Sequence, residues 1–195
     1  MLAHCYSAPS LRYNHALTAI GRLASADEPC PNWHVLWTRN NCEQLVYQQL
    51  LGKGFDAFLP QVDRWRSRGG FRYLSRTPMF PGYVFLHHAV DKWSYLEVCK
   101  TRGIVKLLGE RWDRLATIPD REIDAIRRAQ ASGLPRMQHP YLHDGKRVRV
   151  TRGPLANVEG ILVERGAEHA WLVLSVELLR QSLAVKIGCD AVIPA

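Results

Sequence analysis

Residues 79–86 read Met-Phe-Pro-Gly-Tyr-Val-Phe-Leu, a Pro-Gly turn signal followed directly by alternating aromatic and aliphatic residues. This pattern predicts a tight turn that leads into a half-buried β-strand. Further along, residues 146–163 contain a valine-rich run, a Gly153-Pro154 turn and a second run that opens at Gly160. The two segments predict two modules that both contain β-structure.

The residues around the first segment predict an α+β domain with a mostly antiparallel sheet. Apolar periodicity places strands at 33–38, 55–60, 80–86 and 103–108. Helices are expected at 42–51, at 92–100 and from about residue 119 to Gly133. The second helix is expected to bury Trp93, Leu96 and Cys99.

An arginine-rich segment separates the second strand from the third. Residues 64–76 contain no acidic side chain, and the Gly69-Gly70 pair predicts the tip of a hairpin. Arginines on both sides of this tip would form a cationic flap. They are Arg64, Arg66, Arg68, Arg72 and Arg76.

The C-terminal part shows no helical period. Short valine-rich runs at 147–151, 160–164, 170–176, 183–187 and 191–193 predict a small β-barrel. The expected division is a disordered tail at 1–31, the α+β domain at 32–134, a linker at 135–141 and the barrel at 142–195. A start site placed too early would also explain the polar tail.

The charge of the chain is concentrated in its first domain. The 195 residues carry a net charge of +8, and 47% of them are hydrophobic, which is enough for a folded core. Most of the excess lies within 33–134, where it would attract a polyanion such as nucleic acid. A basic surface that only maintains solubility is the alternative.

The sequence shows no motif typical of a metal site or a catalytic site. The five cysteines are scattered and never spaced Cys-x-x-Cys, so we expect no zinc site, no disulfide framework and a cytoplasmic location. The sequence has no Gly-rich phosphate loop and no metalloprotease or serine-hydrolase motif. We therefore expect no catalytic residues, no metal and no cofactor, and no enzymatic activity.

The segment Phe80-Pro-Gly-Tyr-Val-Phe, together with Thr101-Arg102-Gly103 and Gly153-Pro-Leu with Gly160, resembles the NusG family of transcription elongation factors. The resemblance implies the family's N-terminal domain followed by an SH3-like KOW barrel. Leu59-Pro60 and Pro140-Tyr141-Leu142 are similar to the specialised RfaH, LoaP and UpxY type of antiterminators.

This resemblance implies a monomeric factor that binds RNA polymerase and suppresses pausing or termination on a limited set of operons. The family docks on the β′ clamp helices through positions that match Phe80, Pro81, Tyr83 and Phe85. The alternative is that these rings fill the core of their own domain. A KOW-type RNA- or ribosome-binding module without polymerase contact is the alternative function.

The family also implies nucleic-acid and secondary partners. Arg39, Thr101 and Arg102 match positions that contact the non-template DNA strand, and Arg64, Arg66, Arg68 and Arg72 could contact DNA or nascent RNA. Leu155 lies where the family's KOW domain contacts Rho or the small ribosomal subunit, with simple barrel packing as the alternative. No membrane partner is expected. The residues expected to have a structural role in turns are Gly82, Gly153, Pro154 and Gly160.

Overall fold

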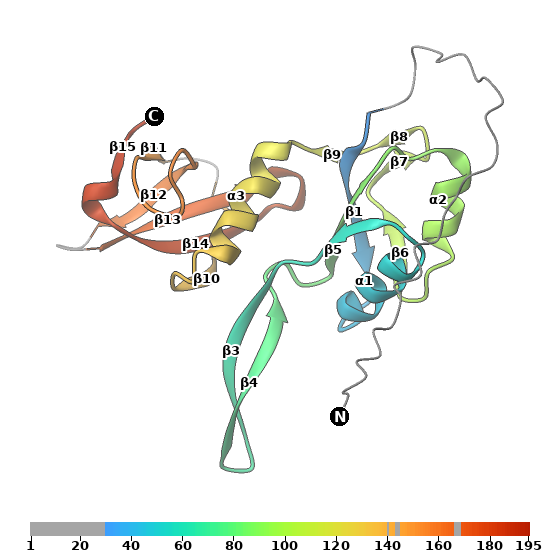
Figure 1. Cartoon of the computed structure of the whole chain (residues 1–195), viewed down its shortest axis with the longest axis horizontal. Coiled ribbons are helices and arrows are strands. Elements are labelled where there is room, and N and C mark those ends of the chain that lie inside the picture. The colour runs from blue at the N-terminus through green and yellow to red at the C-terminus, as the bar shows by residue number, and fades with distance from the viewer. Residues whose placement is uncertain (1–29, 140, 143–144, 166–168) are drawn as a thin grey trace, which may run out of the picture.

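The computed structural model describes residues 30–139, 141–142, 145–165 and 169–195, and Figure 1 shows their arrangement. Nearly all of the expected disordered tail, 1–29, therefore lies outside the described residues. None of the helices in these ranges is long and apolar enough to span a membrane. The fold is α+β, as predicted, with an N-terminal mixed module and a C-terminal β-rich module.

The N-terminal module is built on an antiparallel sheet in the order β2-β5-β1-β6, with β9 also paired to β1. Its strands are β1 (Asn32–Thr38), β2 (Asp56–Phe58), β5 (Tyr83–His88), β6 (Ile104–Leu107) and β9 (Thr117–Ile118). Its helices are α1 (Glu43–Gly52), α2 (Lys92–Cys99) and α3 (Asp120–Ala131). The predicted strands and helices of this module are confirmed with small shifts at their ends.

Helices cover both faces of this sheet. Alternation along β1 sends Leu36 to one face, where it packs with α1 and α2 residues such as Leu50 and Val98. Val35 points to the opposite face, which forms a cluster with α3 residues such as Ile123. The sheet is therefore the middle of three layers.

A long two-stranded hairpin leaves this module. It consists of β3 (Gln61–Arg68) and β4 (Phe71–Pro78), and Arg68 pairs with Phe71 across a two-residue loop. Gly69 and Gly70 both have positive φ, 59° and 83°, which only glycine adopts readily at two successive positions. The predicted hairpin tip is confirmed. A smaller hairpin, β7 (Gly109–Arg111) and β8 (Arg114–Leu115), was not predicted.

The C-terminal module is one six-stranded antiparallel sheet in the order β10-β14-β13-β12-β11-β15. A bulge between Leu162 and Arg165 bends the pairing of β12 with β13. The strands are β10 (Arg136–His139), β11 (Lys146–Val150), β12 (Glu159–Arg165), β13 (His169–Val176), β14 (Gln181–Gly188) and β15 (Val192–Pro194), and the 3₁₀ turns are η1 (Glu177–Leu179) and η2 (Cys189–Ala191).

Helix α3 joins the two modules. One hydrophobic cluster runs from the sheet residue Phe85 through Ile126 of α3 to Leu172 of β13. The guanidinium of Arg128 donates to the carbonyl of Ala156 at 2.8 Å, which ties the exposed side of α3 to the C-terminal module. Figure 1 shows α3 lying between the two sheets.

Two sequence predictions differ from the structure. The expected buried face of α2 is wrong, because Trp93, Leu96 and Cys99 are exposed while Ser94 and Val98 are buried. The expected linker, 135–141, contains β10, which pairs with β14 along its whole length. The domain limits themselves remain a prediction.

The buried His34 makes stability depend on pH. Burial is the main cause that lowers the pKa of His34 from its ordinary 6.5, and the nearby His87 and His88 lower it further. Because the folded state then binds the proton less well than the unfolded chain, this contribution to stability is present above pH 6.5 and is lost as pH falls below it.

We expect His34→Gln to reduce the loss of Tm on acidification between about pH 6.5 and pH 5, because glutamine does not titrate and keeps an amide donor for the Ala116 carbonyl. Thermal unfolding of both proteins over this range measures the effect. Parallel curves at every pH would contradict it.

Candidate functional site

The Pro-Gly segment forms a tight turn at the start of β5. The amide of Tyr83 donates to the carbonyl of Phe80 at 3.2 Å, and Gly82 at the third position of the turn has φ 84°. Proline second and glycine third in a four-residue turn suit type II geometry, which requires positive φ at the third residue. The Gly82 carbonyl also accepts from the Thr38 amide at 2.8 Å, which attaches the turn to the end of β1.

Glu43 of α1 holds this turn by a hydrogen bond. Its carboxylate is buried and its Oε1 accepts from the Gly82 amide at 2.7 Å. A hydrogen bond to a charged acceptor in a buried setting is stronger than a neutral one. Glu43 is therefore a positioning residue that fixes the orientation of the Pro-Gly turn against α1.

An exposed apolar surface lies beside the turn. Trp37 and Tyr83 are directly paired across β1 and β5, so both side chains are on the same face of the sheet. Trp37 is 43% exposed, Tyr83 is half-buried and Pro81 is exposed. We call these three residues, Trp37, Pro81 and Tyr83, the aromatic surface. Large rings with a polar tip make effective anchors for a second protein.

The other two expected docking residues are not on this surface. Phe80 and Phe85 are both buried, and their rings meet edge to face with centroids 5.8 Å apart. Phe58 lies on the other side of Phe85, and the Arg127 guanidinium of α3 covers the Phe58 ring at 5.2 Å. In this arrangement neither buried ring can contact a partner, which corresponds to the alternative of core packing.

Two of the expected nucleic-acid residues come together at the end of β1. The Arg39 amide donates to the Gly103 carbonyl at 2.8 Å, and Gln49 donates to the Arg102 carbonyl at 3.0 Å. Both arginine side chains are exposed, and Arg39 follows Trp37 of the aromatic surface by two residues. Thr101 is different, because it is buried and its hydroxyl accepts from the Lys53 ammonium at 2.9 Å.

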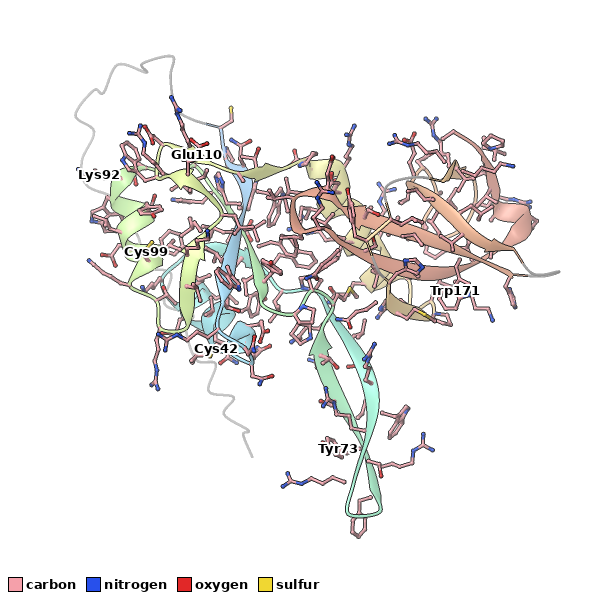
Figure 2. The ribbon with its side chains drawn as sticks, turned by 180° about the vertical axis from the view of Figure 1, so that it is seen from behind. Cys42, Tyr73, Lys92, Cys99, Glu110 and Trp171 are labelled. Atoms are coloured by element: carbon pink, nitrogen blue, oxygen red, sulfur yellow. The ribbon has the colours of Figure 1, made fainter. Side chains whose placement is uncertain are left out.

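The remaining expected nucleic-acid residues lie on the β3–β4 hairpin, separate from the turn. Every side chain from residue 63 to residue 74 is exposed. Figure 2 shows Tyr73 on this hairpin, away from the body of the molecule. The two groups of arginines therefore form two distinct surfaces.

The Gly153-Pro154 segment forms a turn in the C-terminal module, with Gly153 at φ 86°. Leu155 is buried in the core that extends to α3, so its side chain offers no contact surface in this arrangement. The turn role expected for Gly160 is wrong, because Gly160 lies within β12, where an added Cβ would be 2.8 Å from the Val173 carbonyl oxygen. Glycine at this position permits close strand packing.

Sequence reasoning missed two residues of this site. Trp37 was expected only as part of a half-buried strand, whereas its side chain is 43% exposed. Glu43 was not singled out, although an acidic residue in the first turn of a helix is common. No group of metal-ligating side chains occurs in the described ranges.

Comparisons with known proteins agree with these features. A family model described as transcription termination factor nusG matches residues 31–127. The chain is 31% identical over 139 residues to the transcription termination/antitermination protein NusG of Escherichia coli strain K12, covering 70% of this chain and 76% of that protein.

A second relative and a solved structure cover more of the chain. The protein of the same name from Yersinia pestis is 28% identical over 178 residues, 86% of this chain and 98% of that protein. A structure described as "Domain interaction in Thermotoga maritima NusG" has a TM-score of 0.55 at 16% identity, covering 84% of this chain and 97% of that one. The structural likeness concerns the fold.

Proposed function

This chain belongs to the NusG family of transcription termination and antitermination factors, and from that premise we propose that it binds elongating RNA polymerase and suppresses pausing or termination on a limited set of operons. The observation that carries the proposal is the Trp37–Tyr83 pair, with Trp37 exposed and Tyr83 half-buried, beside a turn held by Glu43. An aromatic pair that reaches the surface of an otherwise well-packed sheet is typical of a protein-binding surface.

The proposed polymerase contact is the aromatic surface, set against the clamp helices of the β′ subunit. Tyr83 and Pro81 were expected for this role, and Trp37 joins them because it faces the same way. Two rings and a proline form a small apolar centre, which is the part of an interface that contributes most of the binding energy. Lys106, 6.0 Å from the centre of the Trp37 ring, adds a positive charge at its rim.

Nucleic acid would be contacted next to this surface. Arg39 and Arg102 are exposed within one turn region, where they could hold phosphates of the non-template DNA strand. We propose that three of the hairpin arginines, Arg64, Arg66 and Arg68, form a second contact, whereas the Arg72 guanidinium lies over the Trp65 ring. The positive charge of the module supports both contacts, because phosphate neutralisation favours binding.

The mechanism requires no bond chemistry. A factor that binds one conformation of the polymerase more tightly than another shifts the population toward it. Binding across the clamp in its closed state would therefore reduce pausing. The C-terminal module would contact Rho or the small ribosomal subunit, and Leu155 could take part only after rearrangement of the core that now buries it.

We expect Tyr83→Ala to weaken binding to RNA polymerase by about tenfold or more, because it removes an aromatic anchor from the centre of the contact. Binding of the full chain to purified polymerase, by fluorescence anisotropy or biolayer interferometry, measures the change. Trp93→Ala is the matched control, since Trp93 is 69% exposed on α2 and outside the aromatic surface.

Equal affinities of the Tyr83 variant and the unchanged protein, with both folded, would show that the aromatic surface is not the polymerase contact. Recovery of ribosomes but no polymerase in a pull-down would favour the alternative, an RNA- or ribosome-binding module. Sequencing of RNA from cells that lack the protein would test the limited set of operons, because a specialist affects distal transcripts of few long operons.

A further inference from the structure

The β3–β4 hairpin exposes large apolar side chains that nothing in the described part of the chain covers. Trp65 is 65% exposed and Phe71 is 80% exposed, while Tyr73 and Leu74 are also well exposed. The base of the hairpin is anchored by Val62, which is buried in the core, and by the Gln61 side chain, which donates to Gln44 of α1 at 2.8 Å. Figure 1 shows the hairpin projecting from the body of the molecule.

The register of the hairpin separates its side chains into two faces. Residues paired directly across an antiparallel ladder point to the same side. The pairs Arg64–Ser75, Arg66–Tyr73 and Arg68–Phe71 form one side, which we call the arginine face. The pairs Asp63–Arg76, Trp65–Leu74 and Ser67–Arg72 form the other, which we call the tryptophan face.

Both cations of the tryptophan face, Arg72 and Arg76, interact with side chains of the same face. Asp63 and Arg76 form an ion pair at 3.6 Å. The Arg72 guanidinium lies 5.6 Å from the centre of the Trp65 ring, within cation–π distance. Both cations of this face therefore already have partners within the hairpin.

The cations of the arginine face have no acidic partner among the described residues. This face carries three guanidinium groups and no carboxylate, and no acidic side chain in the described ranges forms an ion pair with Arg64, Arg66 or Arg68. Residues two apart on a strand are about 7 Å apart, so the three cations form a regular row. Such a row complements a chain of phosphates better than it complements a protein surface of mixed charge.

Two exposed rings lie beside this row of cations. Phe71 faces Arg68 and Tyr73 faces Arg66, so each ring sits next to a cation on the same side of the hairpin. Bases within a duplex are stacked on one another and do not offer their flat faces to a protein. Unpaired bases do, and aromatic side chains next to a basic track are how proteins hold them.

We infer that the arginine face binds single-stranded nucleic acid, with Arg64, Arg66 and Arg68 on the phosphates and Phe71 and Tyr73 stacked on unpaired bases. This inference rests on the proposed nucleic-acid contact of the N-terminal module and names its ligand class. The shared chemistry is a run of unpaired nucleotides, which an elongation complex offers both as emerging RNA and as the displaced DNA strand.

The test uses the full chain and labelled oligonucleotides of one sequence, as single-stranded RNA, single-stranded DNA and blunt duplex, in fluorescence anisotropy. We expect single strands to bind at least tenfold more tightly than the duplex. Phe71→Ser with Tyr73→Ser should weaken single-strand binding at least tenfold, because it removes the two rings on which unpaired bases would stack. Trp65→Ser with Leu74→Ser, the matched change on the tryptophan face, should leave the affinity within about twofold of the unchanged protein, since these residues are outside the proposed contact.

Salt dependence separates the two parts of the contact. For single strands the slope of log K against log salt is about −0.7 per phosphate contact, so changing Arg64, Arg66 and Arg68 to glutamine should make the slope shallower by about 2. The Phe71/Tyr73 double variant should keep the original slope. The relative affinities for RNA and DNA identify which strand is the source.

Equal binding of duplex and single strands, or an equal loss from the two double variants, would overturn the inference. Circular dichroism of each variant checks that it is folded. Polymerase binding is measured in parallel. A Phe71/Tyr73 variant that binds polymerase normally but no longer binds single strands supports the inference, whereas a protein that binds single strands but no polymerase refutes the proposed function alone.

Discussion

Phe85→Ala is expected to lower the free energy of unfolding by about 3–5 kcal/mol, the range for truncating a buried phenylalanine. For a chain of this size that corresponds to a fall in Tm of roughly 10 °C. The ring has no exposed area, and it packs between Phe80 and Phe58 where the N-terminal sheet meets α3. Its removal would leave a cavity that the surrounding strands cannot close. Urea denaturation followed by tryptophan fluorescence measures the change.

The control for this prediction is Phe71→Ala, because Phe71 is almost fully exposed at the end of the hairpin. That change should alter stability by less than about 0.5 kcal/mol. A Phe85 variant as stable as the unchanged protein would show that the ring is not part of the core. Its role as an exposed docking residue would then have to be considered again.

Glu43→Ala is expected to cost roughly 2–3 kcal/mol, because it leaves the buried Gly82 amide without its acceptor. The same change should weaken polymerase binding, since the turn that carries Pro81 and Tyr83 loses its attachment to α1. Thermal unfolding and the polymerase-binding measurement are made on the same preparation.

Glu43→Gln separates the hydrogen bond from the rest of the side chain. Glutamine keeps an oxygen at the same position, so it should recover most of the stability and most of the binding lost in the alanine variant. Gln48→Ala, at an exposed position of the same helix, controls for a general effect on α1. If the alanine and glutamine variants lose equal stability, the bond to Gly82 is not what Glu43 contributes.

The elements of both modules could be predicted because their patterns are local. The Gly69-Gly70 pair allows a two-residue hairpin loop, and Pro119 directly precedes the first turn of α3. The buried face of α2 could not be predicted in the same way. Ser94 is buried at the start of the helix, where it forms a capping box with Asp91. In a helix of only two turns, the spacing of apolar residues does not decide which face packs against the sheet.

The strands that the sequence did not predict form through pairing with other strands and have no clear pattern of their own. β10 has no alternating pattern of its own and exists because it pairs with β14. β7, β8 and β9 are two or three residues long, which is too short for a periodic signal. Such elements are set by tertiary contacts rather than by the residues within them.

The candidate site was predictable in its location but not in its exposure. The Pro-Gly signal predicted a turn that the structure contains, and Tyr83 is half-buried beside it. The exposure of Phe80 and Phe85 depends on their packing with α3 residues in one core cluster, and a local sequence pattern does not predict that packing. Trp37 became a candidate contact residue only when its pairing with Tyr83 was known.

We propose that this protein acts on elongating RNA polymerase through the aromatic surface. Single-round transcription with purified polymerase on a template with a pause site and a terminator tests it most directly. The protein should increase the fraction of full-length RNA, and Trp37→Ser with Tyr83→Ala should abolish the increase while the Trp93→Ala control retains it. An increase that is the same with the double variant, or no increase in full-length RNA with the unchanged protein, would contradict the account.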